Sequence, residues 1–194
     1  PIQTGTEVTE KMIQAERPEV VILAIGGEKI IPDIPGIDLP MVCDAWQILG
    51  GTIKPGKHVV VVGGGPIGME TADFLCDKGC RVTLMDLVEK SPVTRFTSHG
   101  YMLHKRLREA DCRMLFSTAV ESIQENELSL KTGEKEDIFS PVDQVVLAVG
   151  MRSRDNLKSF LQDQKIPHYV VGDALEVRRI IDATDEGAKA AWDI

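Results

Sequence analysis

The sequence predicts an α/β fold built around a parallel sheet. Strand-length apolar runs that each end in glycine lie at 20–25, 59–62 and 144–149, and runs of this kind are typical of strands buried on both faces. Segments compatible with helix lie between them, from Met69 to Lys78 and from Ser98 to Ala110. Because strands alternate with helices, we expect a parallel sheet with helices packed on it.

The chain divides into an inner block, residues 57–150, and two flanks, residues 1–56 and 151–194. The elements expected in the first flank are a helix, a buried parallel strand, a proline-rich linker or cover loop, and a short capped helix, at 8–15, 20–25, 31–40 and 44–49. The elements expected in the last flank are a strand ending in Gly-Asp and a helix, at 169–173 and 180–192.

The inner block opens with a strand, a glycine-rich turn and a helix, the order of a dinucleotide-binding βαβ unit. The turn reads Gly63-Gly64-Gly65-Pro66-Ile67-Gly68. Its first glycine is expected to let the chain leave the strand, its third to let backbone N–H groups reach a pyrophosphate, and its last to let helix and strand pack closely. The alternative is a glycine-rich turn that binds no nucleotide.

An acidic residue after the second strand of the inner block bears on the choice between NAD(H) and NADP(H). Asp86 ends the strand-like segment 81–85, about twenty residues past the glycine turn, where this fold places a carboxylate against the adenosine ribose. Because a carboxylate repels a 2′-phosphate, we expect NAD(H) in preference to NADP(H). The nearby Arg81, Lys90 and Arg95 leave NADP(H) open.

The rest of the inner block is expected to consist mainly of strands. A strand is expected at 113–116, a three-stranded antiparallel meander at 119–139, and a closing strand at 144–150. The closing strand resembles the one that ends at Gly26, which indicates repeated architecture.

Composition excludes several classes of function. Thirty acidic and 22 basic residues give a net charge of -8 without a basic stripe, which argues against nucleic acid as a partner. No apolar run reaches the roughly twenty residues that cross a bilayer, and no signal-peptide pattern is present. We therefore expect no membrane partner and a cytoplasmic protein.

No residue has the setting of a catalytic group or of a metal ligand. The four cysteines, Cys43, Cys76, Cys80 and Cys112, form no Cys-x-x-Cys pair and are expected to be reduced packing groups. A redox-active disulfide is the alternative. The four histidines stand apart from any Ser, Cys or Asp constellation, so the chemistry is expected to come from cofactors.

The residues at both termini indicate that the chain is a piece of a longer polypeptide. The chain opens on Pro1 and stops at Ile194 inside a helix-like segment. Processing or an incomplete record could also remove a first methionine.

Five short motifs, in this order, resemble those of the two-dinucleotide-fold flavoprotein superfamily: Ala24-Ile25-Gly26, Ile34-Pro35-Gly36, the turn 63–68 with Glu70, Ala148-Val149-Gly150, and Gly172-Asp173. The closest resemblance is to the C-terminal part of the old yellow enzyme-like NADH:flavin oxidoreductases, the group of 2,4-dienoyl-CoA reductase, 2-enoate reductases and trimethylamine dehydrogenase. The tail from Gly172 to Ala188 carries this likeness.

The resemblance implies a Rossmann-like NAD(P)H-binding domain, residues 57–150, inserted into a partial FAD-binding domain, residues 1–56 and 151–194. It also implies an N-terminal barrel with FMN and a 4Fe-4S cluster, and a first glycine fingerprint for FAD, all outside this chain. NADH would pass a hydride to FAD and on to FMN or the iron–sulfur centre, and the chain alone is expected to be inactive.

The resemblance also assigns roles to residues outside the loop. Glu70 resembles an acid near the nicotinamide, and the alternative is a solvated acid on the helix surface. Val149 and Gly150 would pass close to the nucleotide, and the alternative is that they only end the strand. Gly172 and Asp173 resemble the motif that binds the FAD ribitol, and the alternative is a turn that caps the next helix. Gly26 would border FAD.

Two other classes stay open. One is a stand-alone dinucleotide-binding sensor, and the other is a fragment of a pyridine nucleotide-disulfide oxidoreductase, which needs a cysteine pair near a flavin. The reduced substrate and the oligomeric state do not follow from the sequence.

Overall fold

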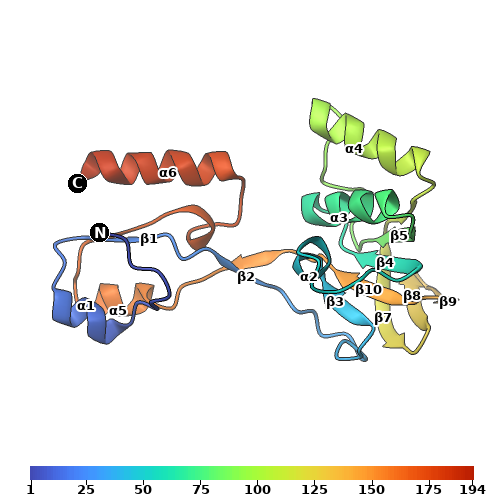
Figure 1. Cartoon of the computed structure of the whole chain (residues 1–194), viewed down its shortest axis with the longest axis horizontal. Helices are drawn as coiled ribbons and strands as arrows, with labels where there is room; N and C mark the ends of the chain where they lie inside the picture. Colours follow the sequence, from blue (N-terminus) through green and yellow to red (C-terminus); the bar gives the residue numbers. More distant parts are fainter. The chain divides into compact units, whose positions relative to one another are not determined.

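The computed structural model describes all 194 residues and divides into two compact units (Figure 1). The first unit is discontinuous and joins Pro1–Ile30 to Met151–Ile194, and the second is the inserted segment Ile31–Gly150. The α/β class agrees with the sequence prediction. The compact second unit begins at Ile31, because the stretch 31–56 adds a strand and a helix to it, whereas the predicted division follows residue 56.

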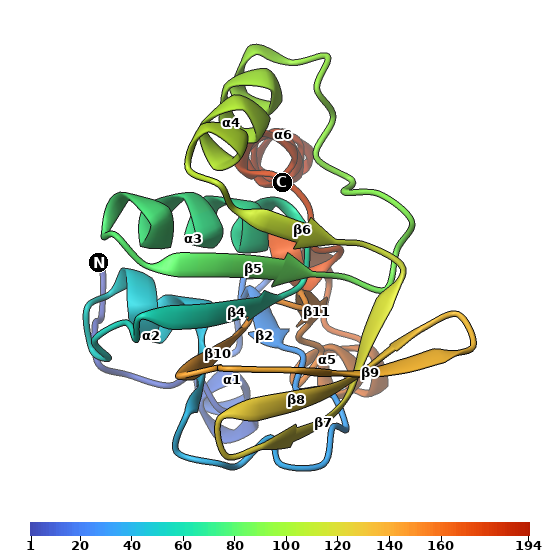
Figure 2. The same ribbon diagram turned by 90° about the vertical axis from the view of Figure 1, so that its right-hand side faces the viewer.

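The second unit is built on five parallel strands in the order β3-β10-β4-β5-β6. Their bounds are Val42–Asp44 (β3), His58–Val62 (β4), Arg81–Met85 (β5), Arg113–Leu115 (β6) and Gln144–Leu147 (β10). The helices on this sheet are Ala45–Leu49 (α2), Pro66–Asp77 (α3) and Ser98–Glu109 (α4). Figure 2 shows β4, β5 and β6 side by side and pointing the same way.

The central strand β4 is buried on both faces, which accounts for its run of four valines. Val59 and Val61 pack with the helices, in a cluster that includes Leu75 and Leu107. Val60 and Val62 pack on the opposite face. The glycine turn therefore leaves a strand that is held rigidly from both sides.

The predicted three-stranded antiparallel meander is present and packs on that opposite face. It comprises Thr118–Gln124 (β7), Glu127–Thr132 (β8) and Lys135–Phe139 (β9). Its Ile123, Leu128 and Leu130 pack against Val60 and Val62. The proline-rich stretch lies against the meander, since the Ile123 N–H donates to the Pro35 carbonyl at 2.8 Å.

The first unit is smaller and less regular. Its elements are Glu10–Glu16 (α1), Val21–Leu23 (β1), Gly27–Lys29 (β2), Met151–Ser153 (β11), Lys158–Asp163 (α5), His168–Val170 (β12), the 3₁₀ turn Gly172–Ala174 (η1) and Ile180–Asp193 (α6). β1 pairs with β12 in parallel, and β2 pairs with β11 antiparallel. Ile13, Leu23 and Leu161 form its core. Among these elements, α5 and the β2–β11 pair were not predicted. None of the helices is long and apolar enough to cross a membrane.

Candidate nucleotide-binding sites

The glycine turn between β4 and α3 has the close approaches that its motif predicts. Gly63 has φ +116°, and a Cβ there would lie 2.3 Å from the Ala148 carbonyl oxygen. A Cβ on Gly68 would lie 1.8 Å from the carbonyl oxygen of Gly63. No side chain fits at either position, so the strand, the turn and the helix pack directly on backbone.

Gly65 differs from these two glycines, because its missing side chain leaves open space. It is the N-cap of α3, with φ -74°, and a Cβ there would meet nothing within 4 Å. Pro66 occupies the first turn, and no side chain of the protein caps this helix end. The backbone amides of the first turn are thus available to an external acceptor, and the helix dipole favours an anion.

Asp86, directly after β5, supports the turn. Its carboxylate accepts a hydrogen bond from the Gly64 N–H through one oxygen and from the Val88 N–H, at 3.1 Å, through the other. A Cβ on Gly64 would lie 2.9 Å from the Phe116 ring. The acid predicted to face the ribose therefore also fixes the turn.

A cavity of about 610 Å³ lies at the carboxyl edge of the sheet, the edge at which open α/β sheets bind ligands. It collects seven of the predicted residues: Gly63, Gly65, Pro66, Ile67, Asp86, Val149 and Gly150. Its further lining residues were not predicted: Pro32, Asp33, Ile34, Val62, Leu87, Val88, Pro92, Thr118, Ala119, Val120 and Ala148. Among these, the proline-rich stretch was expected as a possible cover loop, Val62 lies in the predicted strand 59–62, and Ala148 belongs to one of the five motifs.

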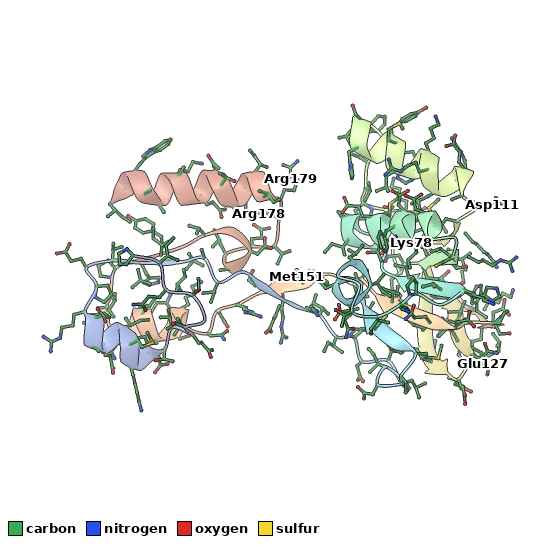
Figure 3. The ribbon with its side chains drawn as sticks, in the orientation of Figure 1. Lys78, Asp111, Glu127, Met151, Arg178 and Arg179 are labelled. Carbon is green, nitrogen blue, oxygen red and sulfur yellow. The ribbon has the colours of Figure 1, made fainter.

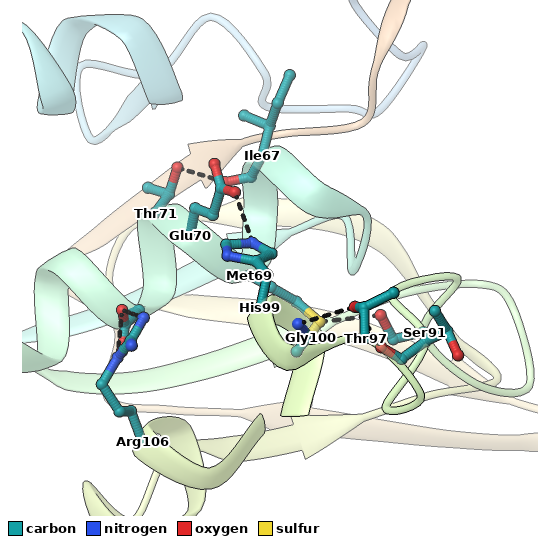
Figure 4. Close-up of polar contacts among 11 residues, drawn as sticks. Ile67, Met69, Glu70, Thr71, Ser91, Thr97, His99, Gly100 and Arg106 are labelled. Carbon is teal, nitrogen blue, oxygen red and sulfur yellow. Dashed lines mark hydrogen bonds and ion pairs between the residues drawn. The ribbon is translucent and has the colours of Figure 1, made fainter. Parts of the chain in front are cut away.

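Residues 91–93 form hydrogen bonds that support the turn, and Figure 4 shows Ser91 beside Met69 of α3. The Ser91 hydroxyl donates to the Gly64 carbonyl at 2.6 Å and lies 2.9 Å from the Met69 sulfur. The Val93 N–H donates to Ser91 Oγ at 3.1 Å, and a ring nitrogen of His104, Nε2, lies 2.9 Å from the Val93 carbonyl oxygen. The turn is therefore connected to α4 by a chain of hydrogen bonds.

Replacement of Ser91 by alanine is expected to weaken nucleotide binding while the fold persists. Loss of one hydrogen bond to the Gly64 carbonyl costs about 1 kcal/mol, or roughly fivefold in dissociation constant. Titrations of the wild type and Ser91→Ala with NADH measure this difference. Ser91→Thr keeps the hydroxyl and is the matched control, so equal weakening in both variants would argue against the role of the hydrogen bond.

Glu70 is not among the residues that line the cavity. Its carboxylate lies 3.1 Å from the Nε2 of His99 on α4, and both side chains are more than half exposed (Figure 4). The structure thus gives Glu70 a partner within the unit, while its predicted role near a nicotinamide stays a prediction.

The first unit contains a second cavity, of about 410 Å³. It brings together predicted residues from both flanks: Gly26 from the first, and Gly172 and Asp173 from the last. The rest of its lining comes from Ala24, Val171, Arg178, Arg179 and the N-terminal residues of α6. Figure 3 labels both arginines at the start of α6.

Hydrogen bonds fix the Gly-Asp turn of this second cavity. The Gly172 N–H donates to Glu186 of α6 at 2.8 Å, and the same carboxylate pairs with the Arg178 guanidinium. One oxygen of Asp173 accepts the Arg178 N–H at 3.2 Å. The hydrogen bond between the Arg178 guanidinium and the Glu186 carboxylate raises the pKa of Arg178. These contacts hold Asp173, Arg178 and Gly172 together in the lining of the cavity, and Gly172 has the left-handed φ of +63°.

The fold and the first cavity define the class of protein: an α/β domain with a dinucleotide-binding turn at the carboxyl edge of its parallel sheet. The model of the pyridine nucleotide-disulphide oxidoreductase family matches residues 3–178, and the chain belongs to this family. It is therefore a domain of the flavin-dependent pyridine nucleotide oxidoreductases.

Similar proteins are longer than this chain. It is 34% identical over 191 residues to a bilirubin reductase of Mediterraneibacter gnavus, and 32% identical over 203 residues to an NADH oxidase of Thermoanaerobacter brockii. These alignments cover 98% and 100% of the chain, but 30% of each relative. The structure of a 2-naphthoyl-CoA reductase complex superposes with a TM-score of 0.84 at 27% identity, over 97% of this chain and 29% of that one.

Proposed function

We propose that the second unit binds NADH and that the first unit contributes to an FAD site, within an old yellow enzyme-like NADH:flavin oxidoreductase. The single observation that carries this proposal is the cavity at the carboxyl edge of the sheet. Its wall joins an uncapped helix N-terminus to an acid at the end of the next strand. The similarity to a bilirubin reductase, an NADH oxidase and a naphthoyl-CoA reductase supports the reductase class.

The residues of the first cavity fit a dinucleotide. Gly65 leaves room for a pyrophosphate against the first turn of α3, where the Ile67 and Gly68 amides would donate to it. Asp86 would accept hydrogen bonds from the ribose hydroxyls and would repel a 2′-phosphate, which favours NAD(H) over NADP(H). Val149 and Gly150 would follow the nucleotide with backbone groups.

The residues of the second cavity fit part of a flavin nucleotide. The Asp173 carboxylate would accept hydrogen bonds from ribitol hydroxyls, and Gly26 would allow close approach of the backbone. When bound, NADH would supply a hydride that reduces FAD, and electrons would pass on to an FMN or 4Fe-4S centre outside this chain. The protein's own part is to orient the two nucleotides.

Anaerobic mixing of the complete protein with NADH tests this function. We expect the flavin absorbance to bleach with NADH, and at least about tenfold more slowly with NADPH at equal concentration, because of Asp86. A protein that binds NADH without reduction of its flavin would instead support the sensor.

Replacement of Asp173 by alanine tests the second cavity. We expect the purified variant to lose most of its FAD while NADH still binds, since the two cavities lie in different units. Flavin content per protein, from absorbance after denaturation, is the measurement. Asp185→Ala, on the α6 surface, is the matched control, and full FAD content in Asp173→Ala would contradict the assignment.

A further inference from the structure

A further cavity, of about 370 Å³, lies at the amino edge of the parallel sheet. The first residues of three neighbouring strands line it, namely His58 of β4, Arg81 of β5 and Arg113 of β6. Because these strands point the same way (Figure 2), their first residues lie at one edge, and the glycine turn leaves the other. The two cavities share no lining residue. Arg81 therefore lies at the far end of β5 from Asp86, in a separate site.

The register of the sheet places the polar residues of this cavity on one face. His58 pairs with Arg81 across β4 and β5, and Thr83 pairs with Arg113 across β5 and β6. Since alternate residues of a strand share a face, His58 lies on the face of Val60, and Arg81 lies on that of Thr83. Val60 pairs with Thr83 and packs with the meander. All these residues therefore lie on the meander face, away from α3 and α4.

The end of the meander, residues 139–141, forms another wall of the cavity. The Arg113 guanidinium lies over the Phe139 ring, 5.7 Å from the ring centroid, in a cation–π contact. The chain just after this wall is tied to β4. The Asp143 N–H donates to the His58 carbonyl at 2.9 Å, and the Asp143 carboxylate accepts the His58 N–H at 2.7 Å. The wall is thus fixed relative to the sheet.

The two arginines of this cavity lack acidic partners, although the chain has a net charge of -8. Neither Arg81 nor Arg113 forms an ion pair or a hydrogen bond through its guanidinium, whereas other arginines of the chain pair with carboxylates. Asp111 is the one carboxylate of the lining. Asp137 on β9 pairs with Lys135 at 3.3 Å, and this hydrogen bond is the main cause of its lowered pKa, while the charge of Arg113 contributes least. The lining thus has an excess of positive charge.

The hydroxyl of Thr83 is a second, independent indication of a ligand. Thr83 is 6% exposed and lines the cavity, and its side chain forms no hydrogen bond within the chain. The other buried threonines are paired, since Thr71 donates to the Ile67 carbonyl at 2.7 Å and Thr118 donates to the Phe116 carbonyl at 3.1 Å. Buried polar groups normally have a partner, so the partner of this hydroxyl is expected in the cavity.

We propose that this cavity binds the oxyanion group, phosphate or carboxylate, of a small organic molecule. The guanidinium groups of Arg81 and Arg113 would donate to its oxygens, since the planar donors of arginine match both kinds of oxyanion. The Thr83 hydroxyl would donate to the same group, and the Phe139 ring would pack on the organic part. The volume falls in the range of small-molecule sites, about 300–1,000 Å³.

Backbone amide signals recorded during titrations with phenyl phosphate and with benzoate, in the presence of NAD⁺, test the proposal. We expect the signals of His58, Arg81 and Ser140 to shift with saturation, while those of Gly65 and Gly172 stay in place. Inorganic phosphate is expected to bind more weakly than phenyl phosphate, because it has no apolar part to pack on the ring. The tighter organic probe identifies the preferred oxyanion, and either preference agrees with the proposal. No saturable shift at the cavity with either organic probe at millimolar concentration would overturn it.

Arginine variants test which groups hold the oxyanion. Arg81→Gln and Arg113→Gln are each expected to raise the dissociation constant of the tighter probe at least about tenfold, the effect of one lost hydrogen bond to a charged group. Arg108→Gln makes the same change in net charge at an exposed position on α4, outside the lining, and is the matched control. Equal weakening in all three variants would show general electrostatics and contradict the site.

Thr83→Val separates binding from stability. We expect this variant to bind the same probe about fivefold more weakly, because one hydrogen bond to the oxyanion is lost. Its Tm is expected to hold or rise, since a buried hydroxyl without a protein partner is replaced by a methyl group of similar shape. An unchanged affinity in Thr83→Val and in both arginine variants would place the probe elsewhere and overturn the proposal.

Discussion

Replacement of Gly68 by alanine is expected to lower the free energy of unfolding by about 3 kcal/mol, or the Tm by about 6–12 °C. The new Cβ would lie 1.8 Å from the Gly63 carbonyl oxygen and 3.3 Å from the Ala148 side chain. Backbone must shift to accommodate it, and the turn between β4 and α3 would open. NADH binding is expected to disappear together with the stability, as thermal denaturation and titration would show.

Gly187 provides the matched control for this substitution. It lies inside α6, and a Cβ there would meet nothing within 4 Å. Gly187→Ala is expected to keep or raise the Tm, because alanine favours helix and restricts the unfolded chain. An unchanged Tm in Gly68→Ala would show that the turn is looser than the structure has it.

Replacement of Asp86 by alanine is expected to weaken NADH binding about 10- to 100-fold. The carboxylate supports the turn through the Gly64 N–H and would bind the ribose, and a hydrogen bond to a charged group contributes about 1.5–3 kcal/mol. Binding of NADPH should weaken less, because the repulsion of the 2′-phosphate is also removed. The ratio of the two dissociation constants is the measurement.

Two further variants separate the contributions of Asp86. Asp86→Asn keeps an oxygen that can accept from the Gly64 N–H but removes the charge, so it should retain the turn and lose discrimination. Glu89→Ala makes the same change in net charge at an exposed position three residues on. If Glu89→Ala and Asp86→Ala change the ratio equally, the effect is general electrostatics and not a contact with the ribose.

The sequence predicted those parts of the fold that depend on local pattern. The valines of β4, buried on both faces, imply a central parallel strand. The spacing of Gly63 and Gly68 follows from two close approaches of backbone. The capping residue Asp44 was also predictable, since its side chain accepts from the Gln47 N–H at 3.0 Å and starts α2.

What could not be predicted depends on contacts between distant segments. β3 has only three residues and joins the sheet by pairing with β10, about a hundred residues later, so the boundary at Ile31 had no local signal. Thr118–Val120 reach the cavity because the start of β7 is held beside the end of β5, where the Thr118 N–H donates to the Asp86 carbonyl at 2.9 Å.

Backbone amide signals recorded during an NADH titration test the central claim most directly, namely that the turn from Gly63 to Gly68 is the NADH site. We expect the amide signals of Gly65, Ile67 and Gly68 to shift with saturation, together with that of Gly150, which also lines the cavity, while signals of the first unit stay in place. Shifts confined to the first unit, or no shift of the turn at millimolar NADH, would contradict the claim.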